Sequence, residues 1–311
     1  MENSRMSLAT VLSLVSISLY GFITFIGLYF LLDGDIQKSI IIASTICVVF
    51  LLILYILKKL KSVHRNFSRK AKFELFTLVV YIIVAVVTII PFAHYFTIYD
   101  RKDEINKSFI QHLDDAKKMF VEYDINVAKR IASYDSKLNQ AINGRDLDST
   151  GFLAEGFKDN QVSHQQQKTT LMKVFNDNLA PQDYDTTKFY AIKYLDESKM
   201  VAQNWVIPFK FIEIINGIEK ETEKWRVKLG KLNQAELRSP LPFNYPPIKF
   251  GSMKDKLKVL EAPSLLSIGL LIFLHVLILL PYFFRSRNSR SWGLWDEINK
   301  RHVEEEVGTI L

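Results

Sequence analysis

The residue types that carry out acid–base, metal or nucleophilic chemistry are sparse in this chain and widely separated. The single cysteine, Cys47, lies in an apolar stretch, and the six histidines lack the spacing of a zinc site. The acidic pairs Asp114–Asp115 and Asp196–Glu197 fall in lysine-rich helical segments, where a solvated surface explains them. No phosphate-binding glycine loop, G-x-S-x-G elbow or H-E-x-x-H motif occurs in the sequence. We therefore predict a protein that is not an enzyme and that binds no metal or cofactor.

One histidine has an unusual position. His275 stands in the middle of SLLSIGLLIFLHVLILLPYFF, residues 264–284, which contain no charged residue. An ionisable group at such a depth in a membrane is costly and often marks a proton or ion path. A hydrogen bond to a neighbouring helix is the plainer explanation, and the proton relay stays open as an alternative. Residues 8–32 offer a stripe of small and hydroxyl residues for that contact: Thr10, Ser13, Ser16, Tyr20, Thr24 and Gly27.

His275 and the hydroxyl residues lie in two of four uncharged stretches of the sequence. The four stretches are residues 8–32, 39–57, 75–99 and 264–284. A helix of about 20 residues crosses a hydrocarbon core of about 30 Å. The sequence thus predicts an all-α integral membrane protein with four transmembrane helices. Three of them form an N-terminal membrane domain, residues 1–99.

A cationic segment, KKLKSVHRNFSRKAK at 58–72, separates the second and third stretches. It contains no acidic residue, and the formal net charge of the whole chain is +7. A nucleic-acid site would spread basic residues over a folded face, so we exclude nucleic acid as a partner. The segment instead predicts a cytoplasmic loop and, secondarily, contact with anionic lipids. Its cations are Lys58, Lys59, Lys61, Arg65, Arg69, Lys70 and Lys72.

This orientation places both termini in the cytoplasm and residues 100–262 on the other side of the membrane, in a helical extracytoplasmic domain. Apolar residues recur there every three or four positions from Ile105 to Ile142, which predicts one long amphipathic helix over 103–143. Shorter elements should follow: a loop at 144–164, a helix at about 165–179, and a helical region at about 183–236 broken near Pro208.

Two further segments allow two interpretations each. The proline-rich stretch SPLPFNYPPIKF, residues 239–250, cannot be helical, and is either a stiff spacer or a docking segment. The cytoplasmic tail, residues 285–311, begins cationic and ends acidic. Its tryptophans suit an interfacial anchor, and a docking peptide is the alternative.

Large apolar residues outside the spans are the candidates for contact with other proteins. A helical core is the plainer explanation of most of them, and packing between subunits is the alternative. The candidates are Phe109, Phe120, Val127, Ile131, Trp225, Phe243, Tyr245, Trp292 and Trp295.

The layout favours a structural or anchoring subunit of an envelope assembly. A membrane sensor is the second class, because helical domains between spans also bind signalling ligands. Such a sensor needs an output module, and the short tail is too small to fold into one. A channel or transporter subunit is the third class, weakened by the uncharged spans.

The order of the parts resembles TssN, an inner-membrane component of the type VI secretion system of Bacteroidetes. The resemblance rests on three spans divided by KKLKSVHRNFSRKAK, on the helical 100–262 domain, and on the last span followed by RSRNSRSWGLWDE. It covers the whole chain at the level of architecture and composition, and it assigns no functional residue.

The resemblance implies a structural subunit of a multimeric complex in the bacterial inner membrane, with residues 100–262 in the periplasm. Its partners would be further copies of the chain and proteins similar to TssO, TssP, TssQ and TssR. The loop 58–72 and the tail 285–311 would face a cytoplasmic baseplate.

Overall fold

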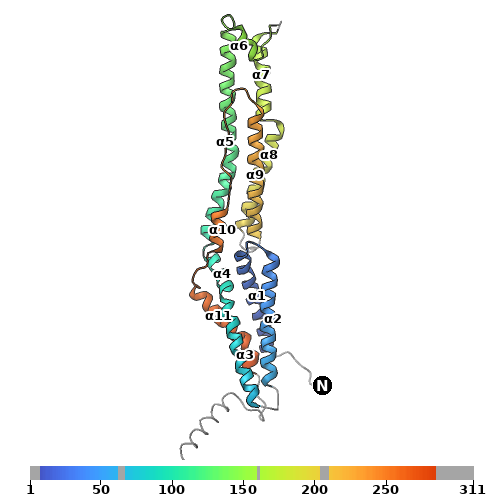
Figure 1. Ribbon diagram of the computed structural model, residues 1–311, viewed down its shortest axis with the longest axis vertical. Helices are drawn as coiled ribbons and strands as arrows, with labels where there is room; N and C mark the ends of the chain where they lie inside the picture. Colours follow the sequence, from blue (N-terminus) through green and yellow to red (C-terminus); the bar gives the residue numbers. More distant parts are fainter. Residues whose placement is uncertain (1–7, 62–66, 160–161, 204–209, 285–311) are drawn as a thin grey trace, which may run out of the picture. The chain divides into compact units, whose positions relative to one another are not determined.

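The computed structural model describes residues 8–61, 67–159, 162–203 and 210–284, and every regular element in these ranges is a helix. The prediction of an all-α protein is therefore confirmed. The chain divides into two compact units. The span unit comprises residues 1–102 and 254–311, and the inserted unit comprises residues 103–253. Figure 1 traces the helices of both along the sequence.

The span unit contains the helices that can cross a membrane. Within the described residues, four segments are long and apolar enough to do so: Leu8–Leu31, Ile36–Lys61, Lys72–Asp100 and Leu265–Phe283. They correspond to the four predicted spans. The first, second and fourth are α1 (Leu8–Leu31), α2 (Ile36–Lys61) and α11 (Leu265–Phe283).

The third span is two helices, α3 (Phe67–Val87) and α4 (Ile89–Asp100). The interruption falls at Thr88, three residues before Pro91. Proline has no backbone N–H to donate to the preceding turn, and its ring crowds the carbonyl four residues earlier. The break is the local consequence of that proline.

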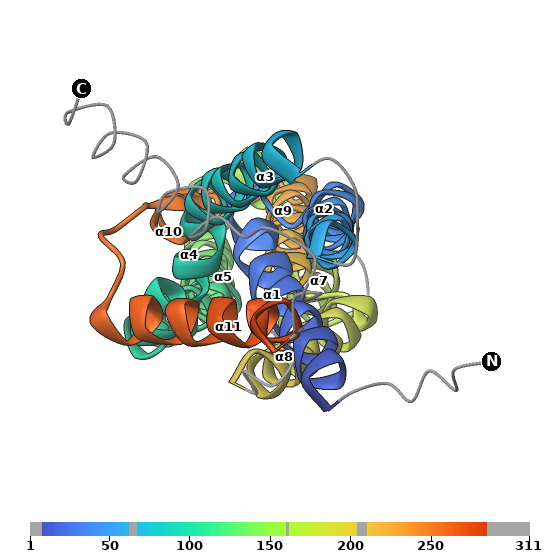
Figure 2. The same ribbon diagram turned by 90° about the horizontal axis from the view of Figure 1, so that it is seen from below.

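Helix α1 is the centre of the span unit, where it packs against α2, α4 and α11 (Figure 2). Gly27 permits the closest approach, because a Cβ atom there would lie 1.8 Å from the carbonyl oxygen of Pro91. The Ser13 hydroxyl donates to the carbonyl oxygen of Ile278 in α11 at 2.9 Å. The stripe of small and hydroxyl residues is thus a helix-contact surface, as its spacing predicted.

His275 has its hydrogen-bond partner on α3 and not on α1, which corrects the expectation from sequence. Its Nδ1 lies 2.7 Å from the Tyr81 hydroxyl. Tyr20 of α1 contributes only its ring, 5.2 Å from the imidazole centroid. The Tyr20 hydroxyl donates instead to Thr88 at 2.5 Å.

The inserted unit is built on one long helix, α5 (Lys102–Asn143), close to the predicted 103–143. The remaining helices are α6 (Ser149–Ala154), α7 (His164–Leu179), α8 (Gln182–Gln203) and α9 (Phe211–Ala235), and α10 (Gly251–Lys258) follows. The break predicted near Pro208 lies outside the described residues, which end at Gln203 in α8 and resume at residue 210.

Helix α6 lies within the segment expected to be a loop. The side chain of Asp148 accepts a hydrogen bond from the Gly151 amide at 2.8 Å and so caps the N-terminus of α6. Phe152 is buried and stacks on Phe157 with ring centroids 4.6 Å apart. One cap and one buried aromatic pair are enough to order a single short helix in an otherwise polar stretch.

Residues 239–250, named the strap, contain no helix, as their prolines predicted. The strap runs back alongside α5 (Figure 1). The Tyr245 hydroxyl donates to the carbonyl oxygen of Asp115 at 2.7 Å, and the Phe250 amide donates to the Glu219 carboxylate at 2.6 Å. Tyr245 and Phe250 are both buried. The chain's own helices α5 and α9 therefore hold the strap.

Candidate protein-interaction surface

Most of the predicted contact residues lie in the core of the inserted unit. Phe109, Phe120, Val127 and Tyr245 are buried, and Phe120 and Tyr245 belong to one apolar cluster with α7, α8 and α9. Ile131, Trp225 and Phe243 are half-buried against the same cluster. This burial explains their apolar character without a partner. Their role in contacts between subunits stays a prediction, and Trp292 and Trp295 lie outside the described residues.

The basic residues after the second stretch stand at helix ends. The Lys61 ammonium donates to the carbonyl oxygen of Tyr282 at 2.5 Å and lies 4.0 Å above the Tyr282 ring, so it caps the C-terminus of α11. Lys58 donates to the Thr10 hydroxyl at 3.2 Å. Lys59 and Lys72 are exposed, whereas Arg65 and the side chains of Arg69 and Lys70 lie outside the described residues.

A buried arginine that is not among the predicted residues organises the C-terminal end of α9 in the inserted unit. Arg130 of α5 is 1% exposed. Its guanidinium donates to the backbone oxygens of Asn233 at 2.7 Å and Ser239 at 3.0 Å, to that of Glu236, and to the side-chain oxygen of Asn233 at 2.9 Å. The last carbonyls of α9 lack partners within the helix, and its C-terminus carries partial negative charge. Arg130 donates hydrogen bonds to these carbonyls, and its positive charge offsets the partial negative charge of the helix end. Its bond to Ser239 also fixes the point where the strap begins.

An ion pair supports this arrangement. The Arg238 guanidinium binds the Glu236 carboxylate, with Nε 2.8 Å from Oε1, and Asn178 of α7 donates to Oε2 at 2.9 Å. Burial alone would raise the pKa of Glu236, but these hydrogen bonds outweigh it and lower the pKa to about 2. Burial lowers the pKa of Arg130, and the Glu236 charge opposes that change. The sequence signal for Arg130 was a cation within the apolar repeat of α5.

An aromatic groove lies between α8 and α9. It has a volume of about 640 Å³ and is lined by the side chains of Tyr190, Tyr194 and Trp225, with Thr186, Thr187, Ala191, Gly217, Lys220 and Glu221 around them. The rings of Tyr194 and Trp225 meet edge to face at 6.1 Å. Of the predicted contact residues, only Trp225 lines this groove.

Gly217 keeps the floor of the groove open. A Cβ atom at this position would lie 2.8 Å from the Tyr194 hydroxyl. Glycine inside a helix costs roughly 1 kcal/mol relative to alanine. The glycine therefore reduces the stability of α9 and gives the Tyr194 side chain room in the groove.

Exposed aromatic residues extend the groove along α8. Phe189 and Tyr190 are 65% and 62% exposed, and their rings meet edge to face at 5.6 Å. Large contiguous apolar patches on a domain surface commonly mark interaction sites. Tyrosine and tryptophan are also the residues most often found at energetic centres of protein interfaces. We name this surface, Phe189 with the groove, the aromatic face.

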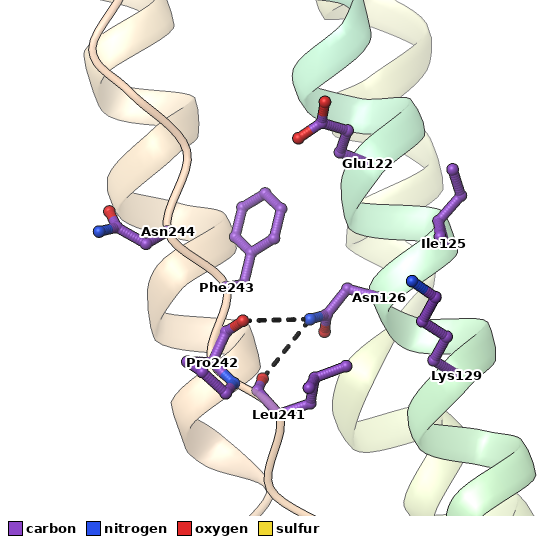
Figure 3. A pocket seen from close by; sticks show the side chains of 8 residues that line it. All are labelled: Glu122, Ile125, Asn126, Lys129, Leu241, Pro242, Phe243 and Asn244. Atoms are coloured by element: carbon purple, nitrogen blue, oxygen red, sulfur yellow. Dashed lines mark hydrogen bonds between the residues drawn. The ribbon is translucent and has the colours of Figure 1, made fainter.

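A second, smaller hollow lies between α5 and the strap, with a volume of about 390 Å³ (Figure 3). Glu122, Ile125, Asn126 and Lys129 line it from α5, and residues 241–244 line it from the strap. The Asn126 amide donates two long hydrogen bonds, 3.5 Å to the Leu241 carbonyl and 3.4 Å to the Pro242 carbonyl. Its polar atoms hold the strap on α5, so this hollow is a seam of the fold.

Among the described residues, no group of three or more His, Cys, Asp or Glu side chains is placed to hold a metal ion. The residues of the aromatic face other than Trp225 were missed by the sequence analysis. The available signals were the adjacent aromatics Phe189 and Tyr190 in a polar helix, and a glycine within α9. Comparison with protein-family models, with curated proteins and with solved structures found no match for this chain.

Proposed function

We propose that this protein is a structural, anchoring subunit of a multiprotein complex that crosses a bacterial envelope. Its four candidate spans would hold it in the inner membrane, with both termini in the cytoplasm and residues 100–262 in the periplasm. The inserted unit would bind partner subunits. A type VI secretion membrane complex is the assembly that this proposal favours, through the resemblance to TssN.

The observation that carries the proposal is the aromatic face. It lies outside the candidate spans, so lipid contact is not the reason for its exposure. Exposed Phe189 and Tyr190 beside a recessed Trp225 match the usual anatomy of an interface, with aromatic anchors next to a pocket. Within the described chain, none of the helices covers the exposed side chains of Phe189 and Tyr190. Further copies of the chain and other envelope proteins are the proposed partners.

The cytoplasmic segments have a separate proposed role. The exposed cations Lys59 and Lys72 suit contact with anionic lipid headgroups. The loop 58–72 and the tail 285–311 would also contact a baseplate. Cysteine substitution at Lys72 and at Lys220, both exposed, tests the orientation with a membrane-impermeant maleimide applied to spheroplasts. We expect labelling at position 220 only. Labelling at position 72 alone would show that the protein has the opposite orientation in the membrane.

Assembly is tested by purifying the tagged full-length protein from native membranes in mild detergent and measuring its native mass. We expect a large complex, and we expect Tyr190→Glu to reduce it to a small species. Val227→Glu is the matched control, because Val227 is also an exposed apolar residue but does not line the groove. If the Tyr190→Glu complex has the same mass as the wild type, the aromatic face does not bind the partner subunits. A small wild-type species would refute the assembly function itself.

A membrane sensor is the second candidate, and the volume of the groove favours it. Small-molecule sites commonly occupy about 300–1,000 Å³ and combine apolar walls with a few polar groups. The groove has three aromatic walls and hydroxyl, ammonium and carboxylate groups. If the wild type purifies as a small species, ligand screening by thermal shift with Tyr194→Ala as the control becomes the deciding measurement.

A further inference from the structure

Polar side chains recur at seven-residue intervals along the third span. Glu74, Tyr81 and Thr88 are 5%, 3% and 5% exposed, so all three face the interior of the span unit. Seven residues are close to two helical turns, which puts the three side chains on one face, about 10 Å apart along the axis. Polar and ionisable groups inside a membrane are costly and usually functional.

Each of these side chains is hydrogen-bonded to another helix of the span unit, two of them to α11 and one to α1. The Tyr282 hydroxyl donates to the Glu74 carboxylate at 2.5 Å, and the Tyr81 hydroxyl lies 2.7 Å from Nδ1 of His275. Tyr282 and His275 are themselves seven residues apart on α11. The third pair is the bond from Tyr20 to Thr88. We name these three pairs the polar ladder.

The polar ladder and its surroundings in the span unit retain unused hydrogen-bonding capacity, and within the ladder it lies on His275. Nε2 of His275 is buried without a partner among the described protein atoms, as are Thr24 Oγ1 and Nδ1 of His94. These are three of the five such atoms in the described chain, and all three belong to the span unit. Buried polar atoms in proteins nearly always have a partner, and internal water commonly supplies it.

The groups also follow the depth of the span. Glu74 lies near the first residue of the third candidate span, His275 near the middle of the fourth, and His94 near the far end of the third. The imidazole of His275 packs against the rings of Tyr20 and Phe50, at centroid distances of 5.2 Å and 5.5 Å. Titratable and hydroxyl groups therefore occur at successive depths from one end of the span unit to the other.

We propose that the polar ladder is a water-assisted proton path through the span unit. At its central step a hydronium ion gives a proton to the free imidazole nitrogen of His275. The opposite nitrogen gives its proton to the Tyr81 oxygen, and the Tyr81 hydroxyl releases its own proton to the next water molecule. One proton moves, each O–H or N–H bond that breaks is replaced by one that forms, and no oxidant or reductant is needed. Tautomer exchange and hydroxyl rotation then restore the starting state.

The competing explanation is that the polar ladder only fixes the register of α3 against α11. Interhelical hydrogen bonds in membranes do stabilise helix association. Both explanations predict that loss of the ladder weakens the bundle. Only the proton path predicts that removal of a single hydroxyl stops proton movement while the fold remains intact.

The test is proton flux into liposomes that contain the full-length protein. Vesicles are loaded with the pH-sensitive dye pyranine, and a potassium gradient with valinomycin sets an inside-negative potential. We expect wild-type protein to acidify the interior faster than protein-free vesicles do. Tyr81→Phe and His275→Ala should return the rate to that of protein-free vesicles. Tyr55→Phe should keep the wild-type rate, because Tyr55 is 61% exposed on the outside of α2.

Elution volume and thermal unfolding of each variant in detergent show whether the fold is intact. Tyr81→Phe keeps the aromatic ring and decides the outcome if His275→Ala does not fold. A wild-type rate equal to that of protein-free vesicles would overturn the proposal. So would a wild-type rate in the Tyr81→Phe variant, which would leave the ladder as a register device.

Discussion

Replacement of Arg130 by methionine is the sharpest test of how the inserted unit is held together. Methionine keeps most of the length and apolar volume of the side chain but removes its donors. Five oxygens would lose a hydrogen bond: the carbonyls of Asn233, Glu236, Arg238 and Ser239, and the side-chain oxygen of Asn233. The backbone around these oxygens lies at the end of a helix and the start of the strap, so water reaches them only if both move.

The cost follows from the number of oxygens left without a donor. A buried polar group that loses its partner costs about 1–3 kcal/mol, and removal of one member of a buried charged cluster costs about 3–5 kcal/mol. Local movement that admits water recovers part of this. We expect a loss of roughly 3–5 kcal/mol in the free energy of unfolding of the inserted unit, against a typical total of about 5–15 kcal/mol. For a domain of this size, such a loss lowers the Tm by on the order of 10 °C.

Trp225 provides the readout, because its ring packs on Phe120 with centroids 5.7 Å apart in the core of the unit. Full-length protein in detergent, with the other three tryptophans changed to phenylalanine, would report unfolding by fluorescence. Lys129→Met is the matched control, since Lys129 is the adjacent residue of α5 and is exposed. A Tm for Arg130→Met equal to that of Lys129→Met would refute the argument that the guanidinium caps α9. Arg130→Lys, which keeps the charge and loses the fork of donors, should fall between the two.

Three further substitutions test other parts of the structure by thermal unfolding. Gly27→Ala should destabilise the span unit because its new methyl group would overlap α4. Gly269→Ala is the control and should not destabilise it, because nothing lies within 4 Å of the Cβ position. Equal effects of the two variants would contradict the close packing of α1 on α4. The pKa of Glu236 is lowered from 4.5 to about 2, so its contribution to stability is complete above pH 4.5 and is lost as the pH falls toward 2. Glu236→Gln should therefore flatten the dependence of Tm on pH across that window, and an unchanged slope would show that another group dominates. Tyr245→Phe should lower the free energy of unfolding by about 1 kcal/mol, because it removes the hydrogen bond from the strap to α5. Tyr190→Phe, on the exposed aromatic face, should leave it unchanged. Equal stability of the two variants would show that the strap is only a spacer.

The elements predicted correctly are those whose signal is local. The four spans follow from uncharged stretches, and α5 follows from an apolar repeat that runs from Ile105 to Ile142. Helix α6 was missed because its signals, an Asp148 cap and the buried ring of Phe152, are short and lie in a polar stretch. The strap was predicted to be non-helical from its prolines, which fix backbone angles at each position.

The contacts that were missed join residues far apart in the sequence. The strap is bound to α5 by Tyr245, whose acceptor is 130 positions earlier, and no local pattern marks such a pair. The partner of His275 was expected on α1 because the hydroxyl residues there are conspicuous. In the structure the partner is Tyr81, which is 194 positions away. In the sequence of its span, this tyrosine is not distinguished from the apolar residues around it. Arg130 was passed over because a single cation within a long amphipathic repeat resembles the edge of the polar face.

Arg130 and His275 are both buried polar side chains, but they differ in how far their hydrogen-bonding groups are satisfied. In the inserted unit Arg130 has an acceptor for every direction of its guanidinium, so its burial is explained by the stability of the helix end that it caps. In the span unit His275 uses one nitrogen and buries the other without a protein partner. A partly satisfied polar network stabilises a core less than well-packed apolar side chains do. Stability alone therefore accounts for Arg130 but not for His275, and that residual cost is the physical reason to test proton movement in the span unit.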